Sequence, residues 1–162
     1  MITGKYPSLR LRRSRKNDWS RRLIEENNLT PNDFILPIFI IDGKNKKIPI
    51  KSMPGVFRYT LDKLNFLVDK AIKSGLPMIA LFPYTEKKKK NLMGTEALNE
   101  DNLVCKALQL IKKKYKNEIG IMCDVALDPY TSHGHDGILQ NGKILNDETN
   151  EMLIKQALLQ AN

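Results

Sequence analysis

The chain has 162 residues, of which 41% are hydrophobic, so it is long enough for one domain with a substantial core. Its longest apolar run, residues 34–41, is too short to cross a membrane, and no charged, apolar and small signal segment opens the chain. These features exclude a membrane-spanning protein and predict a cytoplasmic one.

The net charge of +9 raises nucleic acid as a partner, but the distribution of the charges argues against it. The arginines cluster in residues 10–22, and the lysines form separate runs at residues 87–90 and 112–114. Aromatic residues do not alternate with these charges, as a base-stacking surface requires. We therefore interpret the lysine runs as solvated faces and expect no specific nucleic-acid site. A basic nucleic-acid-binding module is kept as a distant alternative.

The two cysteines, Cys105 and Cys123, give neither a disulfide framework nor a metal-ligand spacing. In a reducing compartment they are most simply interpreted as buried thiols.

The first 32 residues are predicted to form an arm, and residues 33–162 a separate domain. Residues 1–15 have no apolar period, and Asp18 can cap a short helix with Trp19, Leu23 and Ile24 on one side. An arm that carries a tryptophan but has no core must bury it against something else. The alternative is a frayed basic terminus.

Beyond the arm, a strand followed by a helix occurs three times, which predicts an α/β protein with a parallel sheet. The strands are expected at residues 34–41, 78–82 and 119–125. Pro37 suits a strand end or a bulge better than a central position. Thr60 is a candidate N-cap for the first helix, and Gly75 its end. Glu100 and Asp101 suit the start of the second helix.

The third helix is expected after Asp147, with an inward face that includes Met152, Leu153, Ala157, Leu158 and Ala161. Before it, residues 137–145 are predicted to form a hairpin that turns at Asn141-Gly142, a strong type I′ signal.

The third strand runs directly into a polar loop, and we interpret this stretch as the functional face. Strand alternation places Asp124 among apolar residues, and Asp128 and Asp136 follow in the loop. Polar groups gathered where a parallel strand ends are typical of α/β active sites. Each also has a plain structural interpretation, since Asp128 precedes Pro129 and Asp136 precedes Gly137, as in ordinary turns.

The histidines and the serine of this loop carry less weight. His133 and His135 are two residues apart and would bind a metal only if both rings faced one point. They are more often structural. Ser132 has no partner spacing that indicates a nucleophile.

Residues 124–137, Asp-Val-Ala-Leu-Asp-Pro-Tyr-Thr-Ser-His-Gly-His-Asp-Gly, resemble the metal-site segment of the porphobilinogen synthase (delta-aminolevulinic acid dehydratase) family. Further segments resemble the family in the same order, among them Arg10-Leu-Arg-Arg13, Ser52-Met-Pro-Gly-Val-Phe-Arg58, Gly94-Thr-Glu-Ala97 and Lys155-Gln-Ala157. The resemblance implies the first three βα units of a TIM (β/α)₈ barrel, preceded by an extended N-terminal arm. A complete barrel needs about 250 residues, so we expect the barrel to be incomplete in this chain.

The resemblance also implies an activity, the condensation of two 5-aminolevulinate molecules to porphobilinogen in heme biosynthesis. In the family this lyase reaction uses lysine Schiff bases on later barrel strands, and no lysine here lies in a matching motif. We therefore expect the isolated chain to be inactive. The alternative is a non-catalytic truncated remnant or an assembly partner of the same family. Family resemblance also implies homo-oligomer contacts through the arm.

The metal preference follows from three positions of the motif. Zinc-using members have cysteines where this sequence has Ala126, Asp128 and Asp136. Zinc is therefore not expected, whereas carboxylates suit either a weakly held Mg²⁺ bound by Asp128 and Asp136 or a site with no tightly held metal at all. Asp124, Asp128 and Asp136 are the candidate catalytic residues, in roles that support the absent lysines.

Overall fold

The computed structural model describes residues 4–161. These residues form two compact units, one up to Thr30 and one from Pro31 onwards.

The first unit contains a 3₁₀ turn, η1 (Arg13–Arg15), and one short helix, α1 (Asp18–Leu23). The predicted cap residue was wrong by one position, because the N-cap is Asn17 and Asp18 is already helical. The Ser20 hydroxyl donates to the Asn17 carbonyl and accepts from the Asn17 N–H, which closes the first turn. Trp19 and Leu23 remain 62% and 77% exposed, since the unit has no core of its own to bury them.

The second unit is built on a five-stranded sheet with the order β2-β3-β1-β4-β5. Its strands are β1 (Ile35–Ile41), β2 (Lys47–Pro49), β3 (Phe57–Tyr59), β4 (Met78–Tyr84) and β5 (Gly120–Cys123). β1 pairs in parallel with β3 and β4, and β4 in parallel with β5, while β2 is antiparallel to β3. The predicted α/β class and parallel sheet are confirmed, whereas the short strands β2 and β3 were not predicted.

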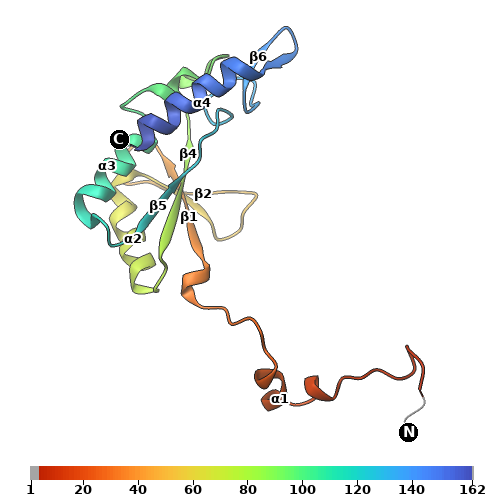
Figure 1. Cartoon of the computed structure of the whole chain (residues 1–162). Helices are drawn as coiled ribbons and strands as arrows, with labels where there is room; N and C mark the ends of the chain where they lie inside the picture. The colour runs from red at the N-terminus through yellow and green to blue at the C-terminus, as the bar shows by residue number, and fades with distance from the viewer. Residues whose placement is uncertain (1–3, 162) are drawn as a thin grey trace. The chain divides into compact units, whose positions relative to one another are not determined.

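Two helices, α2 (Leu64–Lys73) and α3 (Leu103–Tyr115), cover one face of this sheet (Figure 1). Alternate residues of β1 and β4, such as Ile40 and Leu81, pack with Leu64 and Ile111 of the helices in one buried cluster. The other residues of these strands point to the opposite face. On that face Ile35 of β1 is 43% exposed and Met122 of β5 is 45% exposed. Among the described residues, helices therefore cover only one side of the sheet.

Shorter elements complete the second unit. They are η2 (Pro31–Asp33), η3 (Leu61–Lys63), η4 (Lys87–Lys89), η5 (Thr95–Leu98), the hairpin β6 (Ile138–Gln140) with β7 (Lys143–Leu145), and α4 (Asn146–Ala161). The hairpin turns at Asn141 and Gly142, both with positive φ, as the type I′ signal predicted. The hairpin, α4 and η5 enclose a second core of Ala97, Leu127, Tyr130 and Ile138.

Several local predictions need correction. Pro37 lies inside β1 opposite Ala80, not at a strand end. Proline is tolerated there because β3 pairs with β1 only at Phe39 and Ile40 and leaves the first half of that edge without a described partner.

The helix starts also differ from the prediction. The Thr60 side chain does not cap a helix, and its hydroxyl accepts from the Lys46 N–H instead. The cap of α3 is Asn102, whose side chain accepts from the Cys105 N–H at 2.9 Å. Gly75 does end α2, with a φ of +74°.

The predicted inward face of α4 was wrong in part. Met152 and Leu153 pack on the second core, but Leu158 is 60% exposed, while Thr149 and Gln156 are buried. Among the described residues, no helix is both long and apolar enough to span a membrane.

Candidate active site

The carboxyl ends of the parallel strands β1, β4 and β5 meet at one edge of the sheet. Asp42 follows β1, Thr85 follows β4, and Asp124 follows β5. This edge is where α/β proteins of this type place their ligands. The sequence-predicted face of the molecule therefore lies at the expected end of the sheet.

A cavity of about 290 Å³ opens at this edge and brings two of the three candidate aspartates together. Asp124 and Asp128 line it, with Arg58 from β3 and Lys90 from the loop after β4. The Arg58 guanidinium lies 4.6 Å from the centre of the Tyr84 ring, in a cation–π arrangement. Lys90 Nζ donates to the Asp128 carbonyl oxygen at 3.3 Å. The cavity thus combines two carboxylates and two cations.

The carboxyl group of Asp128 is electrostatically perturbed. Loss of solvation raises its pKa above the usual value, and the nearby carboxylates of Asp136 and Asp124 raise it further, while Lys90 opposes the shift. A carboxylate that is short of compensating charge attracts a proton or a cation, so Asp128 is the first candidate at this edge for binding chemistry.

Asp136 hydrogen-bonds to the backbone instead of lining the cavity. Its Oδ1 accepts a hydrogen bond of 2.6 Å from the Leu127 N–H, and Leu127 is fully buried. The carboxylate therefore holds the backbone of the segment that carries Asp124 and Asp128. Asp136 is absent from the residues that line the cavity, although its charge acts on Asp128.

Two glutamines of α4 reach the same segment from the other side. Gln156 Nε2 donates to the Ala126 carbonyl oxygen, and Gln160 Nε2 to the Asp124 carbonyl oxygen, both at 3.2 Å. β5 ends at Cys123, so these bonds follow directly where the ladder stops.

The histidines of the loop hydrogen-bond within the protein. His133 Nε2 lies 3.1 Å from the Leu92 carbonyl oxygen, and His133 Nδ1 accepts from the His135 N–H at 3.1 Å. Both nitrogens of the His133 ring thus have partners in the loops. Ser132 donates its N–H to the Asn91 carbonyl, which ties this loop to the one after β4.

Lys89 links the loop after β4 to the end of β1 and to η5. Its Nζ lies 2.8 Å from Asp42 Oδ2 and 3.6 Å from Glu96 Oε1. The hydrogen bond with Asp42 is the main cause that raises the pKa of Lys89. This lysine is held as an ammonium ion and fixes the loop after β4 against the end of β1.

The carboxylates of this edge are the candidate ligands for a metal ion. Within residues 4–161, no three side chains of the His, Cys, Asp or Glu type converge as a metal site would need. Asp128 and Asp136 carry hard oxygen atoms, which suit Mg²⁺, but Asp136 already uses one oxygen for the Leu127 amide.

The parallel βα units, with charged side chains at the carboxyl ends of the strands, define an α/β protein of the kind that places its site at one end of a partial, TIM-barrel-like sheet. The family model for delta-aminolevulinic acid dehydratase matches residues 8–162, and the chain belongs to this family.

Relatives and a solved structure agree with this assignment. A delta-aminolevulinic acid dehydratase of Bradyrhizobium diazoefficiens is 53% identical over 154 residues, which are 95% of this chain and 43% of that protein. One from Streptomyces coelicolor is 37% identical over 98% of this chain and 48% of its own length. The crystal structure of the Toxoplasma gondii enzyme with its product porphobilinogen superposes with a TM-score of 0.88 at 39% identity, over 94% of this chain and 44% of that chain. The chain thus spans a little under half the length of the relatives it matches.

The sequence alone did not single out four residues of this edge. They are Arg58, Lys90, Gln156 and Gln160. Arg58 and Gln156 lie in segments that resemble the family, which was a usable signal, whereas Lys90 was hidden in a run of four lysines.

Proposed function

We propose that this chain forms the N-terminal half of a porphobilinogen synthase, which condenses two molecules of 5-aminolevulinate to porphobilinogen with loss of two waters. One observation carries the proposal. The chain that carries the cavity at Asp124 and Asp128 superposes, over 94% of its length, on an enzyme crystallised with that product.

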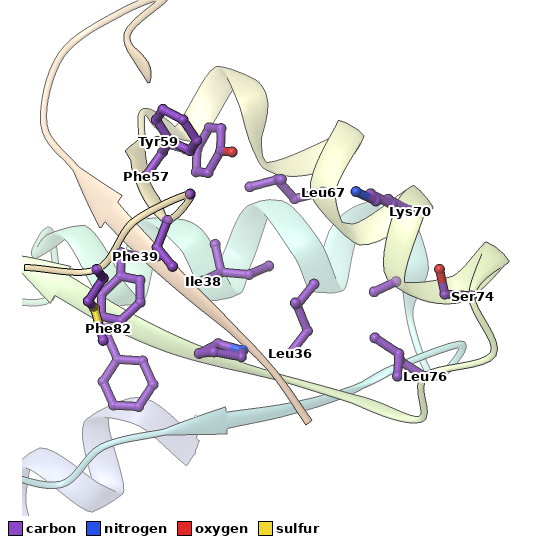
Figure 2. Close-up of a pocket in the computed structure, with 15 residues that line it drawn as sticks. Leu36, Ile38, Phe39, Phe57, Tyr59, Leu67, Lys70, Ser74, Leu76 and Phe82 are labelled. Atoms are coloured by element: carbon purple, nitrogen blue, oxygen red, sulfur yellow. The ribbon is translucent and has the colours of Figure 1, made fainter. Parts of the chain in front are cut away.

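The remaining strands of a (β/α)₈ barrel are proposed to come from residues outside this sequence. An apolar pocket of about 560 Å³ supports this, lined by Leu36, Phe57, Leu67 and Leu76 with Lys70 and Ser74 (Figure 2). It lies beside the half of β1 that β3 leaves unpaired, and its lining is apolar, unlike the charged cavity at Asp124 and Asp128. With exposed Met122 on the uncovered face of the sheet, it is apolar surface that a further strand and helix would bury.

The Schiff-base lysines are proposed to lie in that other half. An imine-forming lysine needs a lowered pKa, so that the amine is free near neutral pH. Lys89 and Lys114 have raised pKa values instead, since Lys89 is paired with Asp42 and Lys114 contacts Tyr115 and Asp69. The role of this half is then to orient and polarise the substrate through Asp124, Asp128 and Asp136.

Mg²⁺ is the metal that this edge suits. Asp128 and Asp136 would hold it weakly, and the ion would supply positive charge for polarising a carbonyl group. The raised pKa of Asp128 supports the proposal, because a cation would relieve the repulsion that Asp136 and Asp124 impose on that carboxylate. Tight zinc binding is not proposed, since the three positions carry no thiolate.

The first unit is proposed to bind a second copy of the protein. Its exposed Trp19, Leu23 and Leu29 are apolar side chains without a core, which fits burial in an oligomer. Specific nucleic-acid binding is not proposed, because Lys88, Lys89 and Lys114 already lie against acidic side chains.

Complementation tests the proposal. We would mix the purified chain with the separately produced C-terminal part of the Bradyrhizobium relative and assay porphobilinogen from 5-aminolevulinate. We expect activity from the mixture and none from either part alone. Asp128→Asn should lower it at least about 10-fold, whereas Glu151→Gln, an exposed carboxylate on α4, should not.

Borohydride trapping is the second readout. With substrate, the mixture should give one lysine adduct on the complementing part and none on this chain. A stoichiometric adduct on this chain alone would overturn the assignment of the lysines. Binding of the two parts without any turnover would favour the non-catalytic assembly partner.

A further inference from the structure

The peptide group between Ala126 and Leu127 is held at both of its polar atoms by side chains. Its carbonyl oxygen accepts from Gln156 Nε2 at 3.2 Å, and its N–H donates to Asp136 Oδ1 at 2.6 Å. One helical turn after Gln156, Gln160 Nε2 holds the Asp124 carbonyl at 3.2 Å. Side chains thus replace the strand ladder that ends at Cys123.

Gln156 occupies a position where an apolar residue would ordinarily be expected. It lies in α4 with no exposed surface, and its Nε2 contacts residues 124–128, which we call the aspartate segment. Its Oε1 is buried and has no hydrogen-bond partner among the described residues. Burying an unsatisfied oxygen is unfavourable, so the amide at this position is explained by what its Nε2 holds.

The held peptide lies, along the sequence, between the two aspartates that line the charged cavity. Asp124 is two residues before Ala126, and Asp128 is one residue after Leu127. A peptide plane that is fixed at both ends sets the backbone direction on either side of it. The directions of both carboxylates therefore depend on a helix that does not itself reach the cavity.

We propose that Gln156 is a positioning residue for the aspartate segment, assisted by Gln160. Gln156 orients the Ala126–Leu127 peptide and, through it, directs Asp124 and Asp128 toward the bound substrate or cation. The functional part of this statement rests on the proposed dehydratase function. The hydrogen-bonding part does not.

Hydrogen exchange on the whole chain tests the hydrogen-bonding part. In Gln156→Leu we expect the Leu127 amide to exchange about 10-fold faster, because its peptide loses one of its two partners. The Leu81 amide in the sheet should be unchanged. The thermal midpoint should move by less than about 4 °C. The variant leaves the Ala126 carbonyl oxygen without its partner but also removes the unsatisfied Oε1 of Gln156. Gln109→Leu, the same change on the exposed side of α3, is the matched control.

A second variant separates a hydrogen bond from simple packing. The side chain in Gln156→Glu can donate to the Ala126 carbonyl only when it is protonated. Protection of the Leu127 amide, taken relative to the wild type at the same pH so that titration of Asp136 cancels, should therefore be retained at low pH and lost as the glutamate ionises. Leu81 protection should not follow this titration. Equal changes at Leu127 and Leu81, or no change at Leu127, would overturn the proposal.

The complemented enzyme supplies the functional readout. Gln156→Leu should lower kcat about 10-fold with a smaller change in KM, because substrate contacts remain while the carboxylates lose their orientation. An unchanged kcat alongside faster Leu127 exchange would overturn the functional part. If wild-type complementation gives no activity, the dehydratase assignment fails, and the exchange experiments still decide whether Gln156 holds the segment.

Discussion

The sheet core and the aspartate segment fix their backbones by different means. In the core, β1 and β4 pair over seven rungs, and α2 and α3 exclude water from one face. Beyond Cys123 the ladder stops, and Asp136, Gln156 and Gln160 hold the backbone with single hydrogen bonds. A core of this kind spreads stability over many contacts, whereas the segment depends on a few side chains. Single substitutions should therefore affect global stability in one region and local geometry in the other.

The largest effect is expected in the core. Leu64→Ala removes a fully buried side chain from the cluster between α2 and the sheet and should reduce the free energy of unfolding by about 2–5 kcal/mol. Urea denaturation measures this. Phe66→Ala on the same helix is the control, since Phe66 is 70% exposed and its loss should change little. Equal effects of the two variants would show that this core is not packed as described.

Cys123 lies at the boundary between the two regions, on the last rung of β5, and reports how far the core extends. Burial raises the pKa of its thiol to about 11, with smaller contributions from Cys105 and Asp124. At pH 8 its thiolate fraction should be on the order of 100-fold lower than for an ordinary thiol. Maleimide labelling of the Cys105→Ser variant across pH measures this. A labelling pKa near 9 would place the end of the core before Cys123.

The core was largely predictable from sequence because it follows periodic apolar patterns. The runs that became β1, β4 and β5 and the apolar faces of α2 and α3 required no knowledge of their partners. The strands β2 and β3 were not found, since three residues such as Phe57–Tyr59 carry no period of their own. Thr60 and Leu158 were misassigned, and Asn102 was not singled out as a cap, because the role of each depends on which element packs beside it.

For the candidate site, the sequence suggested residue types but not their geometry. The motif located Asp124, Asp128 and Asp136, yet these aspartates divide into two that line a cavity and one that holds an amide. Gln156 was part of a family-like segment, but its contact with Ala126 spans 30 residues of sequence. Such long-range hydrogen bonds leave no local pattern to read.

An intermediate effect is expected where the segment is held by Asp136. Asp136→Ala removes the acceptor of the buried Leu127 N–H and should lower the free energy of unfolding by about 1–3 kcal/mol. Asp136→Asn keeps an acceptor oxygen and should lose less. Urea denaturation of the pair separates the hydrogen bond from the charge. If both variants lost the same amount, charge rather than the hydrogen bond would hold the segment.

The smallest effect, and the most local, concerns acid titration in the two regions. Between the helices, the carboxyl group of Asp69 has a lowered pKa, first because Tyr115 donates a hydrogen bond to it and then through Lys114. At the cavity, Asp128 has a raised pKa, first through loss of solvation and then through Asp136 and Asp124. The two groups should therefore act on stability in opposite directions as the pH changes.

For Asp69, whose folded pKa lies below the unfolded value, the stabilisation is present above the unfolded pKa and is lost as the pH falls through the folded one. Asp128 has the reverse order: its favourable contribution is present below an unfolded pKa near 3.8 and is lost as the pH rises through the higher folded value. These opposed contributions offset each other in a global unfolding curve, so each carboxyl group must be followed by carbon-13 NMR. Asp136→Asn and Asp124→Asn should both lower the pKa of Asp128, the former more, while Lys90→Ala should raise it. A pKa of Asp128 that ignored all three substitutions would show that its neighbours do not share one site with it.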